Sequence, residues 1–553
     1  MVIPMYGGPW HEFMTLLVTS ILPANLSELS ANAERAWAGR TDAIEVRIDR
    51  FADDFGELAA YLRVHQDKTW IVTCRSTKEG GQSPDRAGKR AAKLSKSVGD
   101  SGVFVDFEFA DWVDSDEART ELLGALANST GDAARLILSA HDFGNDSTGK
   151  MALPAKLPDM LAVSETACAK IAYKVDHIAD SFAALDAIRE GGQRVSAMAM
   201  GEAGLWTRVL AGKLGAFATY CALDAESATA PGQLTLEEMV NRYRWHDLTE
   251  ATRVFGVIGD PVGHSMGPLL FNRWFAEAGI DAVYLPLLVG RSDDGLRRFL
   301  DGCMKRPWLD LGGLSVTIPH KTAALEWIGD GADAMATGIG AINTLCFDRE
   351  TVTGCNTDSY AAVASLVDAL GCDRSDLSGV TVDILGAGGA ARAIMHGLDE
   401  LGCAMTVFGR SEAKTSALAE AHQAKAKAWQ ERAQRSGDIL INCTNLGMWP
   451  NLDESPMSPD QPRRAGGSAR SLHGCRLVFD LVYHPLETKL LRDAKAAGAN
   501  VLTGLDMFIR QASMQFELWT GKQPDRELGR ELITHPGAPG LAGEIQKRSE
   551  SRQ

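Results

Sequence analysis

Short apolar runs alternate with helix-like stretches along the first 225 residues of the chain. Strands that alternate with helices form parallel sheets, and a count of eight favours a (β/α)8 barrel over a doubly wound open sheet. We predict the barrel, and the open sheet is the competing interpretation. The eight runs are Leu16–Leu22, Ala43–Ile48, Trp70–Cys74, Val103–Phe107, Leu136–Ser139, Ala169–Val175, Val195–Met200 and Ala216–Cys221.

Two further regions follow the predicted barrel. The polar stretch Thr229–Thr252 marks a boundary, and a new apolar strand is expected at Arg253–Ile258. A third region opens with the strand Val380–Leu385 and a glycine-rich turn. The stretch Ser455–His473 is rich in Pro, Ser, Gly and Arg and predicts a surface loop, and the polar tail after His535 is expected to fray.

Composition narrows the class of protein. The chain has 553 residues, of which 45% are hydrophobic and 23% charged, as expected of a soluble protein with two or three domains. Its net charge of -16 argues against nucleic-acid binding, which depends on Lys and Arg meeting phosphates. No apolar run is long enough to cross a bilayer, and residues 1–13 lack the pattern of a signal or transit peptide. The ten cysteines form no C-x-x-C pair, so we expect reduced thiols, no structural zinc and a cytoplasmic location.

One lysine of the first region stands out because it lies inside an apolar run. Lys170 occurs in Ala-Lys-Ile-Ala-Tyr, and an unpaired ammonium inside a barrel is costly. Desolvation favours the neutral amine, which can attack a carbonyl carbon and form a Schiff base. A lysine at a strand end that reaches solvent is the plainer interpretation. Lys174, four residues on, would share its strand face, so periodicity does not choose between the two.

Polar groups follow or interrupt several of the other runs. Glu45 and Arg47 are two residues apart and therefore share a strand face. The carboxyl ends of barrel strands and the loops after them build the active site, so these groups are expected to converge there. The others are Arg75, Glu79, His141, Arg208 and the segment Thr-Ala-Pro-Gly-Gln at 229–233.

Residues 15–235 resemble type I 3-dehydroquinate dehydratases, which are (β/α)8 barrels with a Schiff-base lysine. The matching stretches are Glu-Val-Arg, Thr-Cys-Arg…Glu-Gly-Gly, Ser-Ala-His-Asp-Phe, Lys-Ile-Ala and Ala-Pro-Gly-Gln. The resemblance implies Lys170 as the nucleophile, His141 as the general acid and base, and Glu79 as the group that orients it. It also implies a substrate site around the carboxylate, C1 and the ring hydroxyls, formed by Glu45, Arg47, Arg75, Arg208, Thr229 and Gln233, with Thr229 where serine is common.

A glycine-rich turn in the third region suggests a nucleotide site. Gly386-Ala-Gly-Gly-Ala-Ala391 follows an apolar strand and precedes a helix-like run, the context in which such a turn admits a pyrophosphate. Gly-Arg410-Ser follows the next predicted strand, Met405–Phe408. NAD enzymes usually have an acid in this region, whereas an arginine suits the 2′-phosphate of NADP. A surface arginine without a ligand is the alternative.

The second and third regions together, 253–520, resemble shikimate dehydrogenases. The matching stretches are Gly-Asp-Pro-Val-Gly-His-Ser, Ser-Val-Thr-Ile-Pro-His-Lys, Gly-Ala-Ile-Asn-Thr, Asn-Thr-Asp, Ile-Asn-Cys-Thr-Asn-Leu-Gly-Met and Asp-Leu-Val-Tyr-His-Pro. The resemblance implies Lys321 and Asp358 as the catalytic dyad. It implies substrate contacts from Ser265, Thr317, Asn343, Tyr483 and Gln511, with Gly267 also at this site. It implies NADP contacts from Gly386, Ala387, Gly388, Gly389, Ala390, Arg410, Ser411, Lys414, Thr444 and Gly504.

These resemblances imply three domains. We expect a dehydratase barrel at 12–245, an α/β substrate domain at 252–360 and a Rossmann NADP-binding domain at 361–535. The last long helix, about 505–520, is expected to return to the substrate domain.

Three positions depart from the dehydrogenase pattern. Gly267 stands where a second carboxylate-binding serine is usual, Ser315 replaces an asparagine, and Gly409 replaces the asparagine before the NADP arginine. A glycine at 267 would leave room for a water or for the additional C1 hydroxyl of quinate. We therefore predict some quinate oxidation beside the shikimate reaction.

The two halves imply consecutive reactions, in which 3-dehydroquinate is dehydrated to 3-dehydroshikimate and the product is reduced to shikimate with NADPH. A non-catalytic sensor of quinate metabolism is a rival, but it would be expected to lack the catalytic residues that this chain keeps. A catabolic quinate or shikimate dehydrogenase, working in the oxidative direction, stays open because a sequence does not determine the direction of flux.

Overall fold

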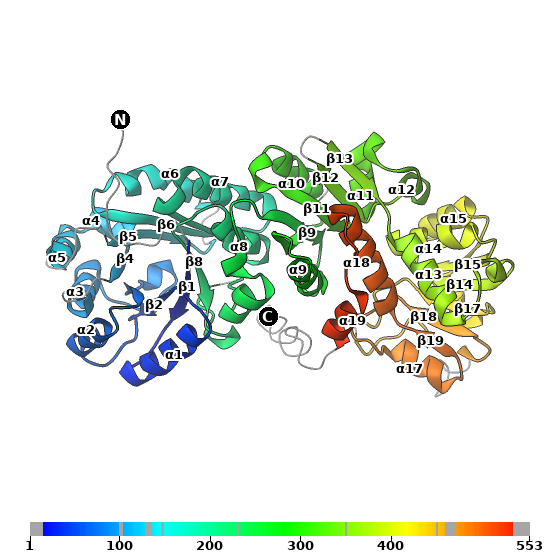
Figure 1. The fold of residues 1–553 in the computed structure, drawn as a ribbon, viewed down its shortest axis with the longest axis horizontal. Helices are drawn as coiled ribbons and strands as arrows, with labels where there is room; N and C mark the ends of the chain where they lie inside the picture. The colour runs from blue at the N-terminus through cyan, green and yellow to red at the C-terminus, as the bar shows by residue number, and fades with distance from the viewer. Residues whose placement is uncertain are drawn as a thin grey trace. The chain divides into compact units, whose positions relative to one another are not determined.

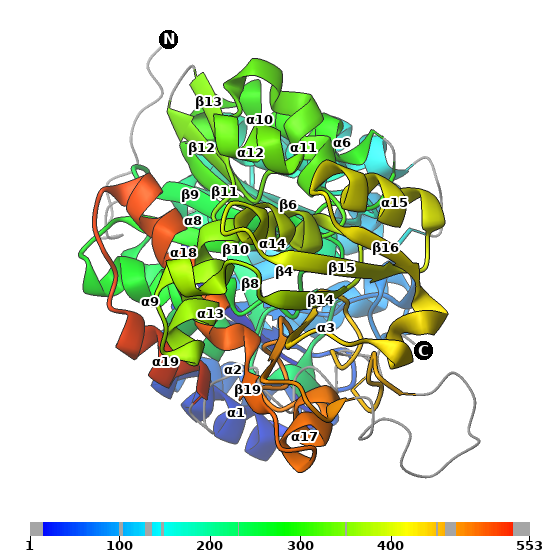
Figure 2. The same cartoon turned by 90° about the vertical axis from the view of Figure 1, so that its right-hand side faces the viewer.

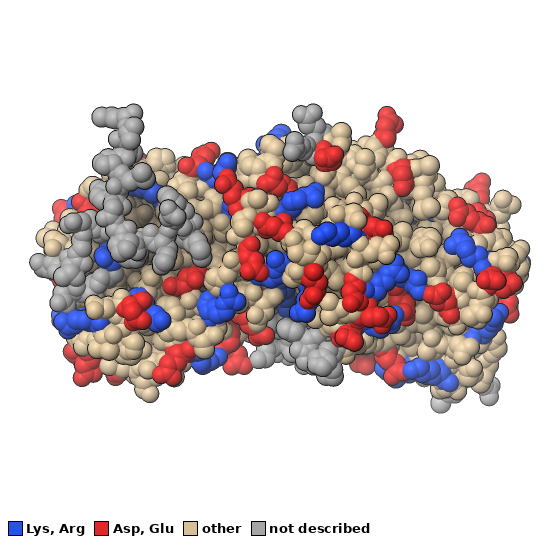
Figure 3. Space-filling view, viewed as in Figure 1, with Lys and Arg blue, Asp and Glu red and all other residues tan. Residues whose placement is uncertain are grey.

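The computed structural model describes residues 15–98, 103–127, 135–144, 149–230, 232–292, 294–348, 351–448, 452–458 and 472–534. The predicted loop Ser455–His473 lies mostly outside these residues, and the predicted frayed tail lies wholly outside them. None of the described helices combines the length and apolar character that spanning a bilayer requires. Acidic and basic side chains are interspersed over the face of the molecule in Figure 3.

The first part of the chain is a nearly closed barrel of eight parallel strands (Figure 1). The strands follow one another in chain order, and β1 pairs with both β2 and β8. The predicted barrel is therefore confirmed, and the open sheet is excluded. The strands are β1 Leu16–Ile21, β2 Ala43–Arg47, β3 Thr69–Thr73, β4 Phe104–Glu108, β5 Leu136–Asp142, β6 Thr166–Lys174, β7 Val195–Met200 and β8 Ala218–Ala222.

Helices cover the outside of this barrel. Their starts follow ordinary capping chemistry: the Asn25 side chain accepts from Glu28 N before α1, and Asp54 does the same for Gly56 N and Glu57 N before α2. The helices are α1 Leu26–Ala38, α2 Phe55–Val64, α3 Ala87–Val98, α4 Phe109–Asp114, α5 Asp116–Ala127, α6 Gly149–Ala162, α7 Phe182–Gly191 and α8 Leu205–Lys213.

A mixed sheet of five strands follows, in the order β10-β9-β11-β12-β13. The strands β11, β12 and β13 pair antiparallel. The strands are β9 Arg253–Gly259, β10 Ala282–Leu288, β11 Leu311–Val316, β12 Thr344–Asp348 and β13 Thr351–Cys355, and the helices are α9 Gly267–Glu277, α10 Gly295–Met304, α11 Lys321–Ile328 and α12 Ala334–Ile339.

The last sheet has six parallel strands in the order β16-β15-β14-β17-β18-β19. Numbered from its first strand, this is the 3-2-1-4-5-6 order of the Rossmann fold, as predicted. Figure 2 shows β14, β15 and β16 side by side. The strands are β14 Thr381–Leu385, β15 Ala404–Gly409, β16 Lys425–Ala428, β17 Ile439–Asn442, β18 Leu477–Asp480 and β19 Asn500–Leu502.

Helices pack on both faces of this sheet. Val382 and Ile384 of β14 belong to one apolar core, and Leu385 belongs to a second one. The helix α18 packs against α13, and through Gln515 and Trp519 it donates hydrogen bonds to the β12 segment. The helices are α13 Asp358–Leu370, α14 Gly389–Asp399, α15 Glu412–Ala421, α17 Lys489–Ala496, α18 Gly504–Thr520 and α19 Arg526–Thr534.

The chain forms two compact units, and the first of them contains more than the barrel. Pro261–Leu311, with α9, β10 and α10, belongs to the same unit as the barrel, whereas Gly312 onward belongs to the second. Within the first unit, Phe299 of α10 stacks on Phe182 of α7 with ring centroids 6.1 Å apart. Arg306 donates to both carboxylate oxygens of Asp186, at 2.7 and 2.5 Å. The three domain boundaries given above stay a prediction.

Candidate active sites

Four alternate strands of the barrel contribute one side chain each to a polar layer inside it. Lys170 Nζ of β6 lies 2.9 Å from Asp106 Oδ2 of β4 and 3.1 Å from Glu45 Oε1 of β2. The ring of Tyr220, on β8, completes the layer, with its centroid 3.7 Å from Nζ. Layers of this kind are usually filled by branched apolar residues, so the polar composition marks a site rather than a core. Lys174 ends β6 and is exposed.

Opposite charges determine the ionisation of this layer. Burial alone would raise the pKa of Asp106, but Arg75 and Lys170 outweigh it and hold that pKa below its usual value. The pKa of Glu45 is lowered in the same way, because Lys170 opposes the effect of burial. Both carboxylates are therefore ionised at neutral pH.

Asp106 was not among the predicted residues, although it is central to the site. Its Oδ1 accepts from Arg75 Nη2 at 2.7 Å and from Ser139 Oγ at 2.6 Å, while its Oδ2 accepts from Lys170. The signal was present in the sequence, because Asp106 and Glu108 interrupt an apolar run two residues apart. Such a pattern places both carboxylates on one face of a strand.

The predicted general base and its partner lie together beside this layer. Glu79 Oε2 lies 3.0 Å from His141 Nδ1 and also accepts from the backbone N–H of His141 at 3.0 Å. Burial lowers the pKa of His141 well below 6.5, and the nearby cations Arg75 and Lys170 lower it further. Burial raises the pKa of Glu79 to about 7. The imidazole is therefore neutral near pH 7 and able to accept a proton.

Arg208 is a buried cation at the same cavity. Burial lowers its pKa to about 10, and its Nη1 donates to the carbonyl oxygen of Tyr220 at 3.2 Å. Its Nε has no hydrogen-bond partner, and no carboxylate among the described residues forms an ion pair with it. A buried guanidinium without a counter-ion suits an anionic ligand.

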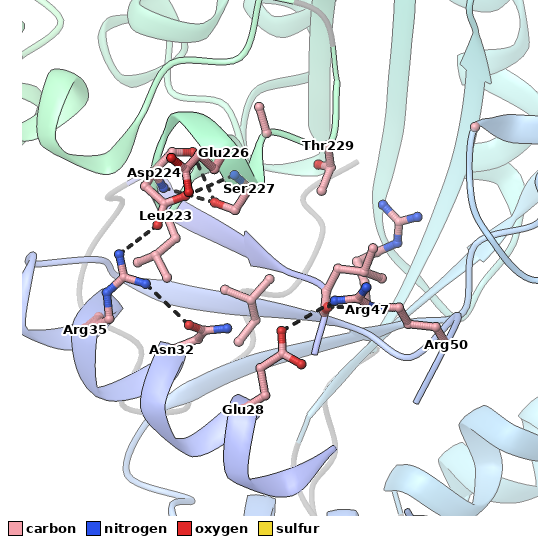
Figure 4. A pocket seen from close by; sticks show the side chains of 14 residues that line it. Glu28, Asn32, Arg35, Arg47, Arg50, Leu223, Asp224, Glu226, Ser227 and Thr229 are labelled. Carbon is pink, nitrogen blue, oxygen red and sulfur yellow. Dashed lines mark hydrogen bonds and ion pairs between the residues drawn. The ribbon is translucent and has the colours of Figure 1, made fainter. Parts of the chain in front are cut away.

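All nine residues predicted for the first half line one small cavity of about 50 Å³. They are Glu45, Arg47, Arg75, Glu79, His141, Lys170, Arg208, Thr229 and Gln233. A larger cavity of about 380 Å³ adjoins it and shares Arg47, Gly80 and Thr229 with it (Figure 4). Arg35 and Asp224 form an ion pair at 2.7 Å across this outer cavity.

The second unit brings together a lysine and an aspartate at the starts of two helices. Lys321 Nζ, at the start of α11, donates to Asp358 Oδ2, at the start of α13. Asn356 Oδ1 accepts from the backbone N–H of Asp358 at 3.0 Å. Asn343 Nδ2 donates to Thr357 Oγ1 at 2.9 Å, which places Asn343 beside the segment that carries Asp358.

The glycine-rich turn lies beside this pair. Gly386 has a φ of 106°, which disfavours other residues, and a side chain at Gly388 would meet no atom within 4 Å. A Cβ at Gly389 would lie 3.1 Å from Lys321 Cδ, and one at Gly386 would lie 3.1 Å from Thr444 Cγ2. The turn thus leaves open space beside Gly388, directly before the start of α14, where a phosphate can approach the helix N-terminus.

Comparisons with known proteins agree with both halves. Residues 17–250 match the type I 3-dehydroquinase family, 257–345 the shikimate dehydrogenase substrate binding domain, and 504–534 the shikimate 5'-dehydrogenase C-terminal domain. A chloroplastic bifunctional 3-dehydroquinate dehydratase/shikimate dehydrogenase of Arabidopsis thaliana is 30% identical over 94% of this chain and 84% of its own length. The chain belongs to this bifunctional family.

Relatives of the second half alone are also found. The shikimate dehydrogenase (NADP(+)) of Maridesulfovibrio salexigens is 35% identical over 52% of this chain and 98% of its own length. A shikimate 5-dehydrogenase of Thermus thermophilus, crystallised with NADP(H) and shikimate, is 31% identical over 51% of this chain and 98% of its own, with a TM-score of 0.43.

The remaining residues predicted for the dehydrogenase half occupy four places. Arg410, Ser411 and Lys414 are exposed at the end of β15, where Ser411 Oγ accepts from Lys414 N. Tyr483 stacks on Phe508 with ring centroids 4.4 Å apart, and Gln511 Nε2 donates to the carbonyl oxygen of Phe508. Thr317 follows β11 and is half-buried, and Gly504 begins α18 where a Cβ would lie 2.1 Å from Leu481 O.

The interpretation that Gly267 leaves free space is wrong. A Cβ at Gly267 would lie 2.9 Å from Tyr284 Cε1, 3.3 Å from Tyr284 Oη and 3.1 Å from Ser265 Oγ. The Tyr284 ring is fixed by stacking on Phe271, with centroids 4.3 Å apart and planes 4° from parallel. An aromatic ring therefore fills the space that was assigned to a water or to the quinate hydroxyl.

The other two departures also have structural partners. A Cβ at Gly409 would lie 2.0 Å from Thr415 Oγ1, so Thr415 fills the space that an asparagine would need. Ser315 Oγ donates to Gln515 Oε1 at 2.7 Å and thereby links β11 to α18. Both substitutions are accommodated by neighbouring side chains.

Proposed function

We propose that the barrel dehydrates 3-dehydroquinate through a Schiff base on Lys170. The Lys170 ammonium first gives up one proton, and the resulting amine adds to the ketone carbon C3. The carbinolamine takes that proton back, and its hydroxyl leaves as water to give an iminium. His141 then removes a proton from C2, and the electron pair is taken up by the iminium nitrogen. The imidazolium next protonates the departing C1 hydroxyl, and hydrolysis of the imine releases 3-dehydroshikimate.

The geometry of the cavity supports the remaining assignments. Glu79 holds the His141 ring by its Nδ1, so that the other ring nitrogen is available for proton transfer. Arg208, the buried cation without a carboxylate partner, is assigned to the substrate carboxylate together with Gln233. The remaining contacts, to the ring hydroxyl groups of the substrate and at the rim of the site, are assigned to Glu45, Arg47, Arg75 and Thr229.

We propose that the second half reduces 3-dehydroshikimate to shikimate with NADPH, which supplies the hydride when bound. Lys321, held by Asp358, gives the proton to the developing alkoxide. The open turn at Gly386–Ala390 suits the pyrophosphate, and Thr444 and Gly504 flank the nucleotide site. Arg410, Ser411 and Lys414 suit the adenosine phosphate. The contacts to the cyclohexene acid are assigned to Ser265, Thr317, Asn343, Tyr483 and Gln511.

A cytoplasmic location is also proposed. All ten cysteines are unpaired, which suits a reducing compartment. Cell fractionation with an antibody against the chain tests this assignment, and recovery in an organelle or in the medium would contradict it.

The observation that carries the proposal is the convergence of all nine predicted residues on one cavity around Lys170. The test is to incubate the purified protein with 3-dehydroquinate and NADPH and to identify the products. Wild type should form shikimate, and Lys321→Ala should stop at 3-dehydroshikimate. Lys170→Ala should leave 3-dehydroquinate unchanged but reduce 3-dehydroshikimate that is added. Formation of shikimate from 3-dehydroquinate by Lys170→Ala would overturn the proposal.

A further inference from the structure

Tyr220 is a member of the polar layer to which neither the sequence motifs nor the proposed mechanism assigns a role. It lies on β8, its residue is 4% exposed, and its ring covers Lys170 Nζ at 3.7 Å. It lines the same cavity as His141 and Arg208. The Tyr220 side chain therefore faces the atom that forms the covalent bond.

The hydroxyl of Tyr220 has no hydrogen-bond partner among the described residues, although it is buried. Tyr220 belongs to an apolar cluster inside the barrel with Val18, Ala172, Met198 and Met200, whose side chains offer no strong acceptor. Burial raises the pKa of Tyr220 well above 10, and the carboxylates Glu45 and Asp106 raise it further. The phenol is therefore protonated and can act as a donor.

A buried hydroxyl without a partner destabilises the free protein, and such groups are rare in native structures. Because Tyr220 lines a ligand cavity, the acceptor for this hydroxyl is expected to belong to a ligand. The ring explains the position of the residue, since an aromatic face stabilises a neighbouring cation, here the ammonium and later the iminium of Lys170. The hydroxyl needs a second explanation, because a phenylalanine would provide the same face.

We propose that Tyr220 is a substrate-contacting residue of the dehydratase, whose hydroxyl donates a hydrogen bond to a substrate oxygen at or next to the carbon that Lys170 attacks. The hydroxyl is the para substituent of a ring whose centre lies 3.7 Å from Nζ, and this places it near C3 of a bound substrate. The inference rests on the Schiff-base function proposed above and adds to it a donor that holds the substrate against the lysine.

The test is Tyr220→Phe in the full-length protein. The value of kcat/KM for dehydration should fall about three- to tenfold, as expected for loss of one neutral hydrogen bond. The melting temperature of the ligand-free protein should rise, because the variant no longer buries an unpaired hydroxyl. The shikimate dehydrogenase activity of the same chain should be unchanged and serves as an internal control of folding.

Tyr173→Phe is a matched control. Tyr173 is also buried, on β6, but its hydroxyl donates to Asp180 O at 3.3 Å and it does not line the cavity. This variant should lower the melting temperature, where Tyr220→Phe should raise it, and should leave dehydration unchanged, where Tyr220→Phe should slow it.

Three results separate the possibilities. Unchanged dehydration in Tyr220→Phe would overturn the proposal, and so would a fall in activity that accompanies a fall in melting temperature, since that would indicate a structural hydroxyl.

Borohydride trapping with 3-dehydroquinate distinguishes this failure from failure of the proposed function. If wild type is trapped on Lys170 but Tyr220→Phe behaves as wild type, only the role of Tyr220 is rejected. If wild type is not trapped on Lys170, the Schiff-base function itself is rejected.

Discussion

Replacing Lys170 with methionine should destabilise the barrel as well as abolish dehydration. The change keeps an unbranched side chain one heavy atom shorter but removes an ammonium that lies 2.9 Å from Asp106 and 3.1 Å from Glu45. Asp106 keeps its bond from Arg75, whereas Glu45 keeps only the hydroxyl donors Ser20, at 2.6 Å, and Thr73, at 3.0 Å, as hydrogen-bond partners among the described residues of the barrel. Removing one partner of a buried ion pair costs about 3–5 kcal/mol.

A double-mutant cycle tests whether this cost comes from the carboxylate that is left unpaired. Glu45→Gln alone should lower the free energy of unfolding, because Lys170 loses one of its two carboxylate partners. In the Lys170→Met background the same change should raise the free energy of unfolding, because it removes a buried charge without a counter-ion. A reversal of sign is more informative than either single value, since cavities and altered packing do not produce it.

The pH dependence gives an independent check. In wild type the lowered pKa of Glu45 means that its ion pair contributes stability above the unfolded pKa of about 4 and that this contribution is lost as pH falls. In Lys170→Met the largest lowering cause is absent, so burial, now opposed by Arg47 and the Ser20 hydroxyl, should raise that pKa. The stability difference between wild type and variant should therefore be largest near pH 7 and should shrink as pH falls towards about 4.

Urea unfolding followed by tryptophan fluorescence, at several pH values and with the dehydrogenase activity measured in parallel, provides these free energies. Trapping by borohydride should also be lost in the variant. If Lys170→Met unfolds at the same urea concentration as wild type at pH 7, or if Glu45→Gln has the same sign in both backgrounds, the charge network described above does not stabilise the barrel.

Further outcomes follow at other positions. Arg410→Ala should lower the NADP/NAD ratio of kcat/KM about ten- to a hundredfold, the value of a charge-assisted hydrogen bond to a phosphate, and equal use of both cofactors by wild type would reject that role. Dehydration should decline as pH falls through about 7, because protonation of Glu79 removes the acceptor of His141 Nδ1, and Glu79→Gln should flatten this limb of the pH profile. Gly267→Ser should lower kcat/KM for shikimate, because its Cβ would lie 2.9 Å from Tyr284, and a variant with improved shikimate kinetics would contradict that packing.

The barrel could be predicted from the sequence because parallel strands are buried on both faces and therefore form continuous apolar runs. Each of the eight predicted runs overlaps a strand, and β1 ends one residue before the predicted end. The largest differences at one end are three residues: β5 was expected to end at Ser139 and extends to Asp142, and β6 was expected to begin at Ala169 and begins at Thr166. Polar residues at the mouth of a barrel are part of the strand but interrupt the apolar pattern, so His141 was placed just past a strand that contains it.

The site was predictable where a residue type is unusual for its position, and less so where it looks ordinary. Lys170 was noticed because a lysine is costly in an apolar run. Tyr220 belongs to the same layer but looks like a core residue, since a tyrosine in a buried strand is common. Asp106 lay inside a predicted run and received no role, because its partners are distant in the sequence: Arg75 lies 31 residues away and Lys170 lies 64 residues away. The pairing of these charged residues is a consequence of barrel closure, and it cannot be read from a single sequence.

Gly267 illustrates the opposite error, in which an absent side chain was taken for an empty space. Whether a glycine leaves a cavity depends on its neighbours, and the neighbour here is Tyr284, which lies 17 positions along the chain on β10 and is itself held by Phe271 of α9. Protein interiors are packed densely, so the space beside a glycine is usually filled from another element. The argument for quinate oxidation therefore loses its physical basis, and Tyr284 becomes the side chain beside Ser265 whose position a change at 267 would disturb.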